Sequence, residues 1–449
     1  MEEITGAISS FIWGWPMIVM LLGTHLYLTI RLKFPQRYIF KAIGLSFKKE
    51  EGEGDVSHFA SLATSLAATI GTGNIIGVAT AVALGGPGAV LWCWLTGVFG
   101  IATKYAEGLL AVRYRQKTKR GMILGGPMYV IEKGMNCRWL AVLFCVFTVA
   151  ASFGIGNTIQ SNAIATIVTE STSIPAWAIG IVLTILAGLV IIKGVKGISR
   201  VCSVLVPIMA VFYILSSLYI LFLNRSVLGE SISLIFSSAF TARAAGGGFA
   251  GSTVMMACRY GIARGLFSNE SGMGSAPIVA AAAKTKNPVR QALVSSTGTF
   301  WDTVIICAIT GLVLVSSIVM HPDISSSDGA SLTRLAFAKI PAVGTPIMVA
   351  SIIAFAFSTI LGWSYYAEKA LEYLTRGRGI RAFRIVFVLM VFVGSIANLS
   401  TVWNLADIMN ALMAIPNLIS LVVLAGVSVS LTGRFLWNGK MDDRFEDGD

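Results

Sequence analysis

The sequence predicts an all-α polytopic membrane protein, and its composition carries that prediction. Apolar residues make up 55% of the 449 residues and charged residues only 12%, whereas ordinary globular proteins have about 25% charged residues. The mean hydropathy is +0.77. The 46 glycines and 10 tryptophans fit helices in a bilayer, where glycine is frequent and tryptophan marks the interfaces. The composition excludes a disordered chain, a coiled coil and a disulfide-rich secreted domain.

Apolar runs of about 20 residues, the length needed to cross a bilayer, predict about eleven transmembrane helices in a single domain, 1–449. The runs lie at 11–30, 57–82, 89–112, 139–165, 175–192, 201–223, 236–262, 288–317, 344–368, 381–398 and 403–431. We do not expect the first run to be a cleaved signal peptide, because the Lys and Arg residues from Arg31 to Lys49 follow it and none precedes it.

Lys and Arg residues collect in alternate loops and thereby predict the orientation. Most of the 34 lie in 31–56, 113–138, 193–200, 284–290, 369–384 and the tail 432–449. The opposite loops hold only Arg225, Arg243, Arg334 and Lys339. The positive-inside rule therefore predicts an N-terminus outside the cell membrane and a C-terminus in the cytoplasm. Because the net charge of +12 is spread over loops and not gathered on one face, we expect no nucleic-acid partner.

The second run is interrupted near its middle by Gly71, Thr72, Gly73 and Asn74. At such depth the backbone leaves a helix only where it lines a cavity. The freed N–H groups at the start of the next helical stretch then suit a carboxylate. The alternative is that Gly73 and Gly77 serve close helix packing.

A second glycine-rich stretch interrupts the seventh run. The region from about Ala245 to Lys286 is too long for one crossing, so the helix breaks either at 244–251 or at 267–274. We favour 244–251, because Arg259 and Arg264 then stand at a cytoplasmic helix end. Residues 268–284 would then form an intracellular helix. Interrupted helices five runs apart are typical of inverted-repeat transporters.

Polar residues within two further runs are candidates for ligand contacts. Phe355, Ser358 or Thr359, and Trp363 share one face of the ninth run. The hydroxyl oxygens are suitable ligands for a small cation, although such hydroxyls often bond the carbonyl one turn back. In the fourth run Gln160 offers both a donor and an acceptor; an interhelical hydrogen bond is the alternative role.

Three acids lie inside the runs, away from the run ends, where burial of a charge is costly. We expect Glu107 to pair with Lys104, three residues earlier. Asp302 and Asp407 remain open as gating partners or proton sites. No metal spacing among the histidines, no paired cysteines and no nucleotide-binding loop occur in the sequence. No nucleophile and base stand at helical spacing either, so we do not expect an enzyme.

Four motifs carry a resemblance to a known family. They are Gly71-Thr72-Gly73-Asn74, the run from Gly85 to Trp94, Phe267-Ser268-Asn269-Glu270, and the run from Ser358 to Tyr366. In this order they resemble the alanine or glycine:cation symporter family, the bacterial and archaeal sodium:alanine carriers. The resemblance runs from about Phe11 to Val429. It departs at Leu91 and Cys93, where Phe and Met are expected.

The resemblance implies a LeuT-like fold and a function. It predicts a five-plus-five inverted repeat, with repeats at 57–223 and 236–431 after an extra N-terminal helix at 11–30. The implied function is symport of a small neutral amino acid, alanine or glycine, with sodium ion by alternating access in the lipid bilayer. Coupling to protons through Asp302, Asp407 or Glu107 is the alternative. A channel is less favoured, because pore filters are usually rings of repeated subunits. No obligate protein partner is implied.

The resemblance also implies a set of site residues. Thr72, Gly73 and Asn74 would hold the substrate carboxylate, while Gly251 and neighbouring backbone would receive the amino group. Gln160, Thr359 and Trp363 would bound the pocket. The sodium ion would lie between the carbonyl oxygens of Ala67, Ile70 and Phe355 and the hydroxyl oxygens of Ser358 and Thr359.

Overall fold

The computed structural model describes residues 2–49, 51–118, 122–241, 253–324, 329–397 and 400–445. Helices dominate these ranges, and the only sheet in them is a hairpin of β1 (Gln116–Lys117) and β2 (Ile123–Leu124). Seven helical stretches of the described residues are long and apolar enough to cross a membrane, or eight if one bent pair counts as a crossing. This agrees with the predicted helical membrane class. The expected count of eleven crossings is not confirmed: α10 (Ala176–Ile191) and α19 (Ile380–Ile396) have only 16 and 17 residues, and the region of the run at 236–262 holds two helices of 13 and 16 residues.

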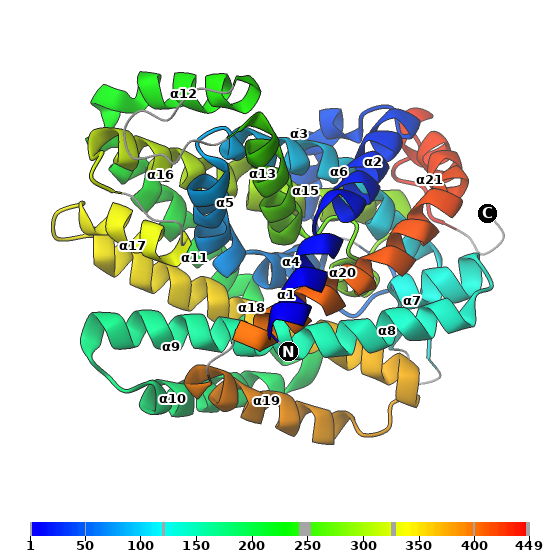
Figure 1. Ribbon diagram of the computed structural model, residues 1–449. Helices are drawn as coiled ribbons and strands as arrows, with labels where there is room; N and C mark the ends of the chain where they lie inside the picture. Colours follow the sequence, from blue (N-terminus) through cyan, green and yellow to red (C-terminus); the bar gives the residue numbers. More distant parts are fainter. Residues whose placement is uncertain are drawn as a thin grey trace.

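The first half of the chain contains the following further helices. They are α1 (Glu2–Ile12), α2 (Trp15–Arg31), α3 (Ile39–Ser46), α4 (His58–Thr69), α5 (Val78–Gly85), α6 (Ala89–Arg113), α7 (Pro127–Tyr129), α8 (Arg138–Phe153), α9 (Ile159–Thr172) and α11 (Gly194–Leu223). Figure 1 shows α10 beside α19, and the two helices are in contact. The bent pair is α4 and the stretch Gly73–Gly85, whose axes differ by 55°.

The second half begins with two helices where one run was expected. Its helices are α12 (Leu228–Phe240), α13 (Val254–Asn269), α14 (Pro277–Ala280), α15 (Pro288–Thr299), α16 (Ala308–Met320), α17 (Gly329–Ala338), α18 (Gly344–Thr375), α20 (Ser400–Val423) and α21 (Ala425–Thr432). The run predicted at 236–262 thus covers the end of α12 and the start of α13, and the interruption favoured at 244–251 falls between them, outside the described residues. The run predicted at 403–431 is likewise divided between α20 and α21 at Leu424.

In the described part of the chain, five π-helical segments interrupt or extend the helices. They are η2 (Gly73–Gly77), η3 (Val130–Gly134), η4 (Gly154–Thr158), η6 (Phe300–Cys307) and η7 (Gly433–Trp437). Such segments are frequently found at functional sites, and η2, η4 and η6 all border the site described below.

Helix starts follow from local chemistry. The Ser57 hydroxyl caps α4 by accepting from the Ala60 amide, and Thr253 caps α13 in the same way. The Asn287 side chain caps α15, whose first residue is a proline. These caps satisfy amides that have no partner inside their own helix.

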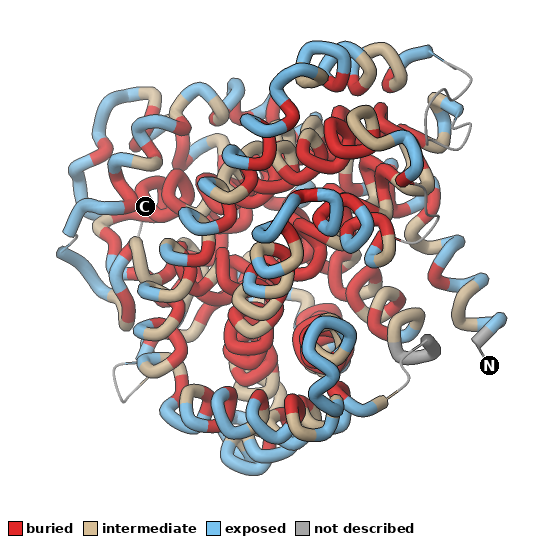
Figure 2. The backbone as a smooth tube through the Cα atoms, turned by 90° about the vertical axis from the view of Figure 1, so that its left-hand side faces the viewer, coloured by how far each residue is buried: buried red, intermediate tan, exposed pale blue. Residues whose placement is uncertain are grey.

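Buried residues fill the interior of the molecule (Figure 2), and the large hydrophobic core includes residues of α4 and η2. Helix α6 packs against α13 and α15, and α18 packs against α4, α8, α9 and α11. The outward faces of α10 and α11 expose large apolar side chains, including Leu189 at 60% and Ile208 at 62%. Apolar patches of this kind on a polytopic helical protein are expected to contact lipid.

Candidate functional site

The bend between α4 and α5 leaves backbone groups free for a ligand. Helix α4 ends at Thr69 and Ile70 is extended, with ψ 95°. The Asn74 Oδ1 atom accepts a hydrogen bond from the Gly71 amide at 2.9 Å, which fixes the turn. Thr72 and Gly73 begin the next helical stretch, and the first amides of a helix have no acceptor inside it.

The other end of the Asn74 side chain reaches across to η6. Its Nδ2 atom donates to Asp302 Oδ1 at 2.6 Å, and Asn74 is fully buried. The second carboxylate oxygen of Asp302 accepts from the hydroxyls of Ser268, at 3.1 Å, and Thr303, at 2.6 Å. The Asn74 side chain therefore joins η2 to η6, and Asp302 extends the link to α13 through Ser268.

Five oxygen atoms converge where α18 passes the bend. The Ser358 hydroxyl lies 3.1 Å from the Ala67 carbonyl oxygen and 2.8 Å from that of Phe355. The Thr359 hydroxyl lies 3.4 Å from the Ile70 carbonyl oxygen and 3.0 Å from that of Phe355. The bent α4 thus turns two carbonyls toward two hydroxyls of one α18 turn. Oxygen clusters of this kind suit a small hard cation.

Gln160 and Trp363 are two further candidate site residues, and both are buried in the interior. The Gln160 amide donates to the Ile155 carbonyl at 3.0 Å, while its buried Oε1 atom has no hydrogen-bond partner among the described residues. A Cβ atom on Gly71 would stand 2.6 Å from Thr359 Oγ1 and 3.6 Å from Gln160 Oε1. The absent side chain at Gly71 is therefore what leaves room between these two groups.

Glu270 is a site residue that the sequence motif contained but to which we assigned no role. It follows α13 in the left-handed conformation, with φ 52°, and is buried. Its carboxylate accepts hydrogen bonds from Trp363 Nε1, at 3.1 Å, and from the Ser275 hydroxyl. In the sequence, Glu270 is followed closely by Gly272 and Gly274, and these glycines are the signal that could have indicated a helix end at Glu270. Both glycines have positive φ in the structure.

The expected pair of Lys104 and Glu107 does not form. The Lys104 ammonium donates to the carbonyls of Asn269, at 3.0 Å, and Glu270, at 3.3 Å. Glu107 accepts from the amides of Gly272 and Gly274 and from Asn417. Both side chains therefore bind the break after α13 and not each other, because the broken backbone offers unpaired carbonyls and amides within reach.

Helix α13 ends at Asn269, inside the alternative break region 267–274. Residues 268–284 do not form the expected intracellular helix, since after Asn269 only Pro277–Ala280 is helical within them. The favoured break at 244–251 and the candidate Gly251 lie outside the described residues. The positive φ angles of Glu270, Gly272 and Gly274 explain why the helix cannot continue.

A cavity of about 590 Å³ opens to the bend from one side. Its wall is formed by Thr72 and by residues of η2, α5, α9, α13, α17, α18 and α20, which include Gly73, Glu170, Arg264, Phe267, Arg334 and Asp407. Phe267 lies over Gly73, where an added Cβ atom would stand 3.5 Å from its ring. Gln160, Thr359 and Trp363 lie deeper, with exposed fractions of 3%, 2% and 0%. We call this cavity the vestibule.

The arrangement of the helices around the bend defines the class. The chain has a LeuT-like fold, shared with MhsT in complex with L-phenylalanine. That structure matches with a TM-score of 0.56 at 16% identity, over 84% of this chain and 98% of that one.

The particular family follows from the sequence. A model of the sodium:alanine symporter family matches residues 1–447, so the chain belongs to this family of secondary transporters, which are not enzymes. It is 49% identical to the sodium/alanine symporter AgcS of Methanococcus maripaludis, over 96% of this chain and 97% of that protein. It is 50% identical to an uncharacterized transporter of Haemophilus influenzae, over 99% and 98% of the two chains.

Proposed function

We propose that this protein imports alanine or glycine together with sodium by alternating access. The convergence of the Ser358 and Thr359 hydroxyls on three backbone carbonyls carries the proposal. These five oxygens would bind one sodium ion, with Ala67, Ile70 and Phe355 as the carbonyl ligands. The likeness to a relative named as a sodium/alanine symporter supports both cargoes.

The substrate would lie at the bend, deeper than the vestibule. Its carboxylate would accept from the amides of Thr72 and Gly73, which Asn74 presents by holding the turn. Gln160 Oε1 is a buried acceptor without a partner among the described residues, and it suits the substrate ammonium group. Gly251 stays part of this proposed site.

The two interrupted regions would be equivalent helices of two inverted repeats, 57–223 and 236–431, in one domain preceded by the helix at 11–30. The bend after α4 and the break after α13 support this arrangement. The vestibule would open outside the cell, because Arg334 and Glu170 in its wall belong to the loops that carry few basic residues. The N-terminus would be outside and the C-terminus in the cytoplasm.

Counterflow in proteoliposomes tests the proposal directly. Labelled alanine and glycine should exchange in the presence of sodium, whereas leucine should not compete. Exchange that proceeds equally well without sodium under a proton gradient would contradict sodium coupling. The proton-coupled permease would then replace it.

A variant of Asp407 offers a separate test of whether sodium or protons drive uptake. Its Oδ1 atom has no hydrogen-bond partner among the described residues, and the residue lines the vestibule. If sodium drives uptake, Asp407→Asn should leave the sodium concentration for half-maximal uptake within about twofold of the parent, because the five-oxygen site is intact. Loss of uptake in Asp407→Asn, together with pH-dependent uptake by the parent protein, would favour protons.

Trp363 is expected to exclude larger substrates. Its buried indole fills the volume beyond the bend and contacts Gly156, where an added Cβ atom would stand 2.3 Å from that of Trp363. Trp363→Ala should let leucine compete with alanine, while costing about 3–5 kcal/mol of stability. Competition counterflow measures the change in selectivity.

Two further variants separate pocket size from stability. Phe387→Ala removes an equally buried ring packed against Phe153 and should leave selectivity unchanged. Trp363→Phe keeps most of the volume and should still exclude leucine. A folded Trp363→Ala protein that rejects leucine would remove Trp363 from the pocket.

A further inference from the structure

The chain that leads into α4 is joined to the segment after α14. The Asp55 amide donates to the Ala282 carbonyl at 2.7 Å, and the Lys284 amide donates to the Val56 carbonyl at 2.8 Å. A further backbone bridge joins Glu53 to Thr285. We call residues 51–57 and 281–285, with these bonds between them, the inner seam.

Arg115 crosses the inner seam with a single side chain. Its Nη1 atom donates to the carbonyls of Ala281, at 3.2 Å, and Ala283, at 2.9 Å. Its Nη2 atom donates to the Glu53 carbonyl at 3.0 Å. Arginine suits this role because its planar fork carries five donors, whereas lysine presents a single point of attachment.

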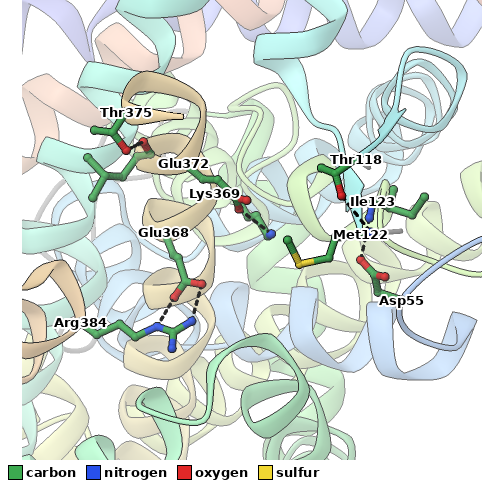
Figure 3. A network of polar contacts seen from close by, with 10 residues as sticks. Asp55, Thr118, Met122, Ile123, Glu368, Lys369, Glu372, Thr375 and Arg384 are labelled. Atoms are coloured by element: carbon green, nitrogen blue, oxygen red, sulfur yellow. Dashed lines mark hydrogen bonds and ion pairs between the residues drawn. The ribbon is translucent and has the colours of Figure 1, made fainter. Parts of the chain in front are cut away.

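Other contacts at the inner seam are weaker or lie at its margin. Lys117 and Glu53 form an ion pair of 2.6 Å, but both side chains are more than half exposed, and such pairs contribute little. The hydrogen bond to Lys117 lowers the pKa of Glu53, so this carboxylate is ionised at neutral pH. Asp55 accepts from the Ile123 amide at 3.1 Å, which ties β2 to the same segment (Figure 3).

The inner seam lies on the side away from the vestibule. It is built from the loops 31–56, 113–138 and 284–290, which carry most basic residues and are expected to face the cytoplasm. The vestibule reaches Thr72 and Gly73 from the other side, next to Arg334. The bend is therefore open toward one face and closed by the inner seam toward the other.

Resting on the alternating access proposed above, we propose that Arg115 is the positioning residue that holds the inner gate closed. Its guanidinium group joins residues 51–57 to residues 281–285 by donating hydrogen bonds to three backbone carbonyls. Because α4 begins at His58, separation of the inner seam moves α4 away from the 277–285 segment. That movement opens the bend to the cytoplasm.

A cysteine placed in the first turn of α4, next to the inner seam, reports its opening. Ser61 is 1% exposed, and its hydroxyl donates to the Val279 carbonyl at 3.1 Å, so Ser61→Cys is covered while the inner seam is closed. The background carries Cys137→Ser and Cys258→Ser, because these are the two partly exposed cysteines. The measurement is the rate at which a water-soluble maleimide labels the purified full-length protein.

Arg115→Gln should raise that rate at least about tenfold, a shift of about 1.4 kcal/mol in the open-to-closed equilibrium. Lys117→Gln is the matched control. It removes only the exposed ion pair with Glu53, two residues along the chain from Arg115, and should leave the labelling rate unchanged. Arg115→Lys should give an intermediate rate. The apparent affinity for external alanine should fall in Arg115→Gln, because fewer molecules are outward-facing.

A second variant, in the 51–57 segment of the inner seam, tests the proposal even if the arginine variants misfold. An added Cβ atom on Gly54 would stand 2.3 Å from the Lys284 amide nitrogen, so Gly54→Ala pushes the inner seam apart. Gly44→Ala is its control, because no atom lies within 4 Å of an added Cβ there. Unchanged labelling in both Arg115→Gln and Gly54→Ala would overturn the proposal. The labelling needs no substrate, so the result stands whether or not alanine and sodium are the cargoes.

Discussion

Asn74→Ala is expected to weaken alanine binding by roughly 100-fold or more, because two buried polar groups lose their partner at once. Without the amide, the Gly71 N–H loses its acceptor and Asp302 Oδ1 loses its donor. The turn that presents Thr72 and Gly73 is then no longer fixed. Equilibrium binding of labelled alanine to the purified variant, in saturating sodium, measures the loss.

The control for this variant is Asn224→Ala. Asn224 is also buried and donates to the hydroxyls of Ser316 and Ser317, far from the bend in sequence. It should lower stability while leaving alanine affinity unchanged. Normal affinity in folded Asn74→Ala would show that the turn does not need its side chain.

Removing the two α18 hydroxyls should have the other large effect. Thr359→Ala is expected to raise the sodium concentration for half-maximal uptake by about tenfold, and Ser358→Ala combined with it should abolish sodium stimulation. The reason is the loss of two of the five converging oxygens, while the carbonyls of Ala67, Ile70 and Phe355 remain. Uptake at a series of sodium concentrations and fixed ionic strength measures this.

Two matched variants isolate the ligand role. Thr359→Ser keeps the hydroxyl and should restore most sodium affinity. Ser364→Ala removes another buried α18 hydroxyl, which bonds only the Leu361 carbonyl, and should have no effect on sodium. Equal sodium dependence in the parent and the double variant would exclude the proposed cation site.

Hydropathy predicts the helical class and most helices because a bilayer requires long apolar stretches. It does not give the helix bounds near 236–262, where α12 ends at Phe240 and α13 begins at Val254. Apolar content does not distinguish a crossing from two shorter helices. The end of α13 is set by three residues at positive φ, and this conformation depends on what Lys104 and Glu107 bind there.

The site was predictable to the extent that it depends on backbone chemistry. The glycine interruption at Gly71 and the hydroxyl pair on α18 indicate a broken helix beside possible cation ligands, and both lie together in the structure. The partners of Asn74 were not predictable, because Asp302 is 228 residues away along the chain. The role of Arg115 was equally hidden, since carbonyl acceptors leave no pattern in a sequence.

The size of the vestibule has a pharmacological consequence. Pockets that hold drug-sized molecules measure about 300–1,000 Å³, and a cavity of about 590 Å³ falls in that range. If the protein works by the alternating access proposed above, the vestibule must narrow when the site closes over its substrate. A compound larger than the substrate, added from the vestibule side, would then fill this space and prevent the closure. We therefore expect that inhibitors of this cycle need not resemble amino acids.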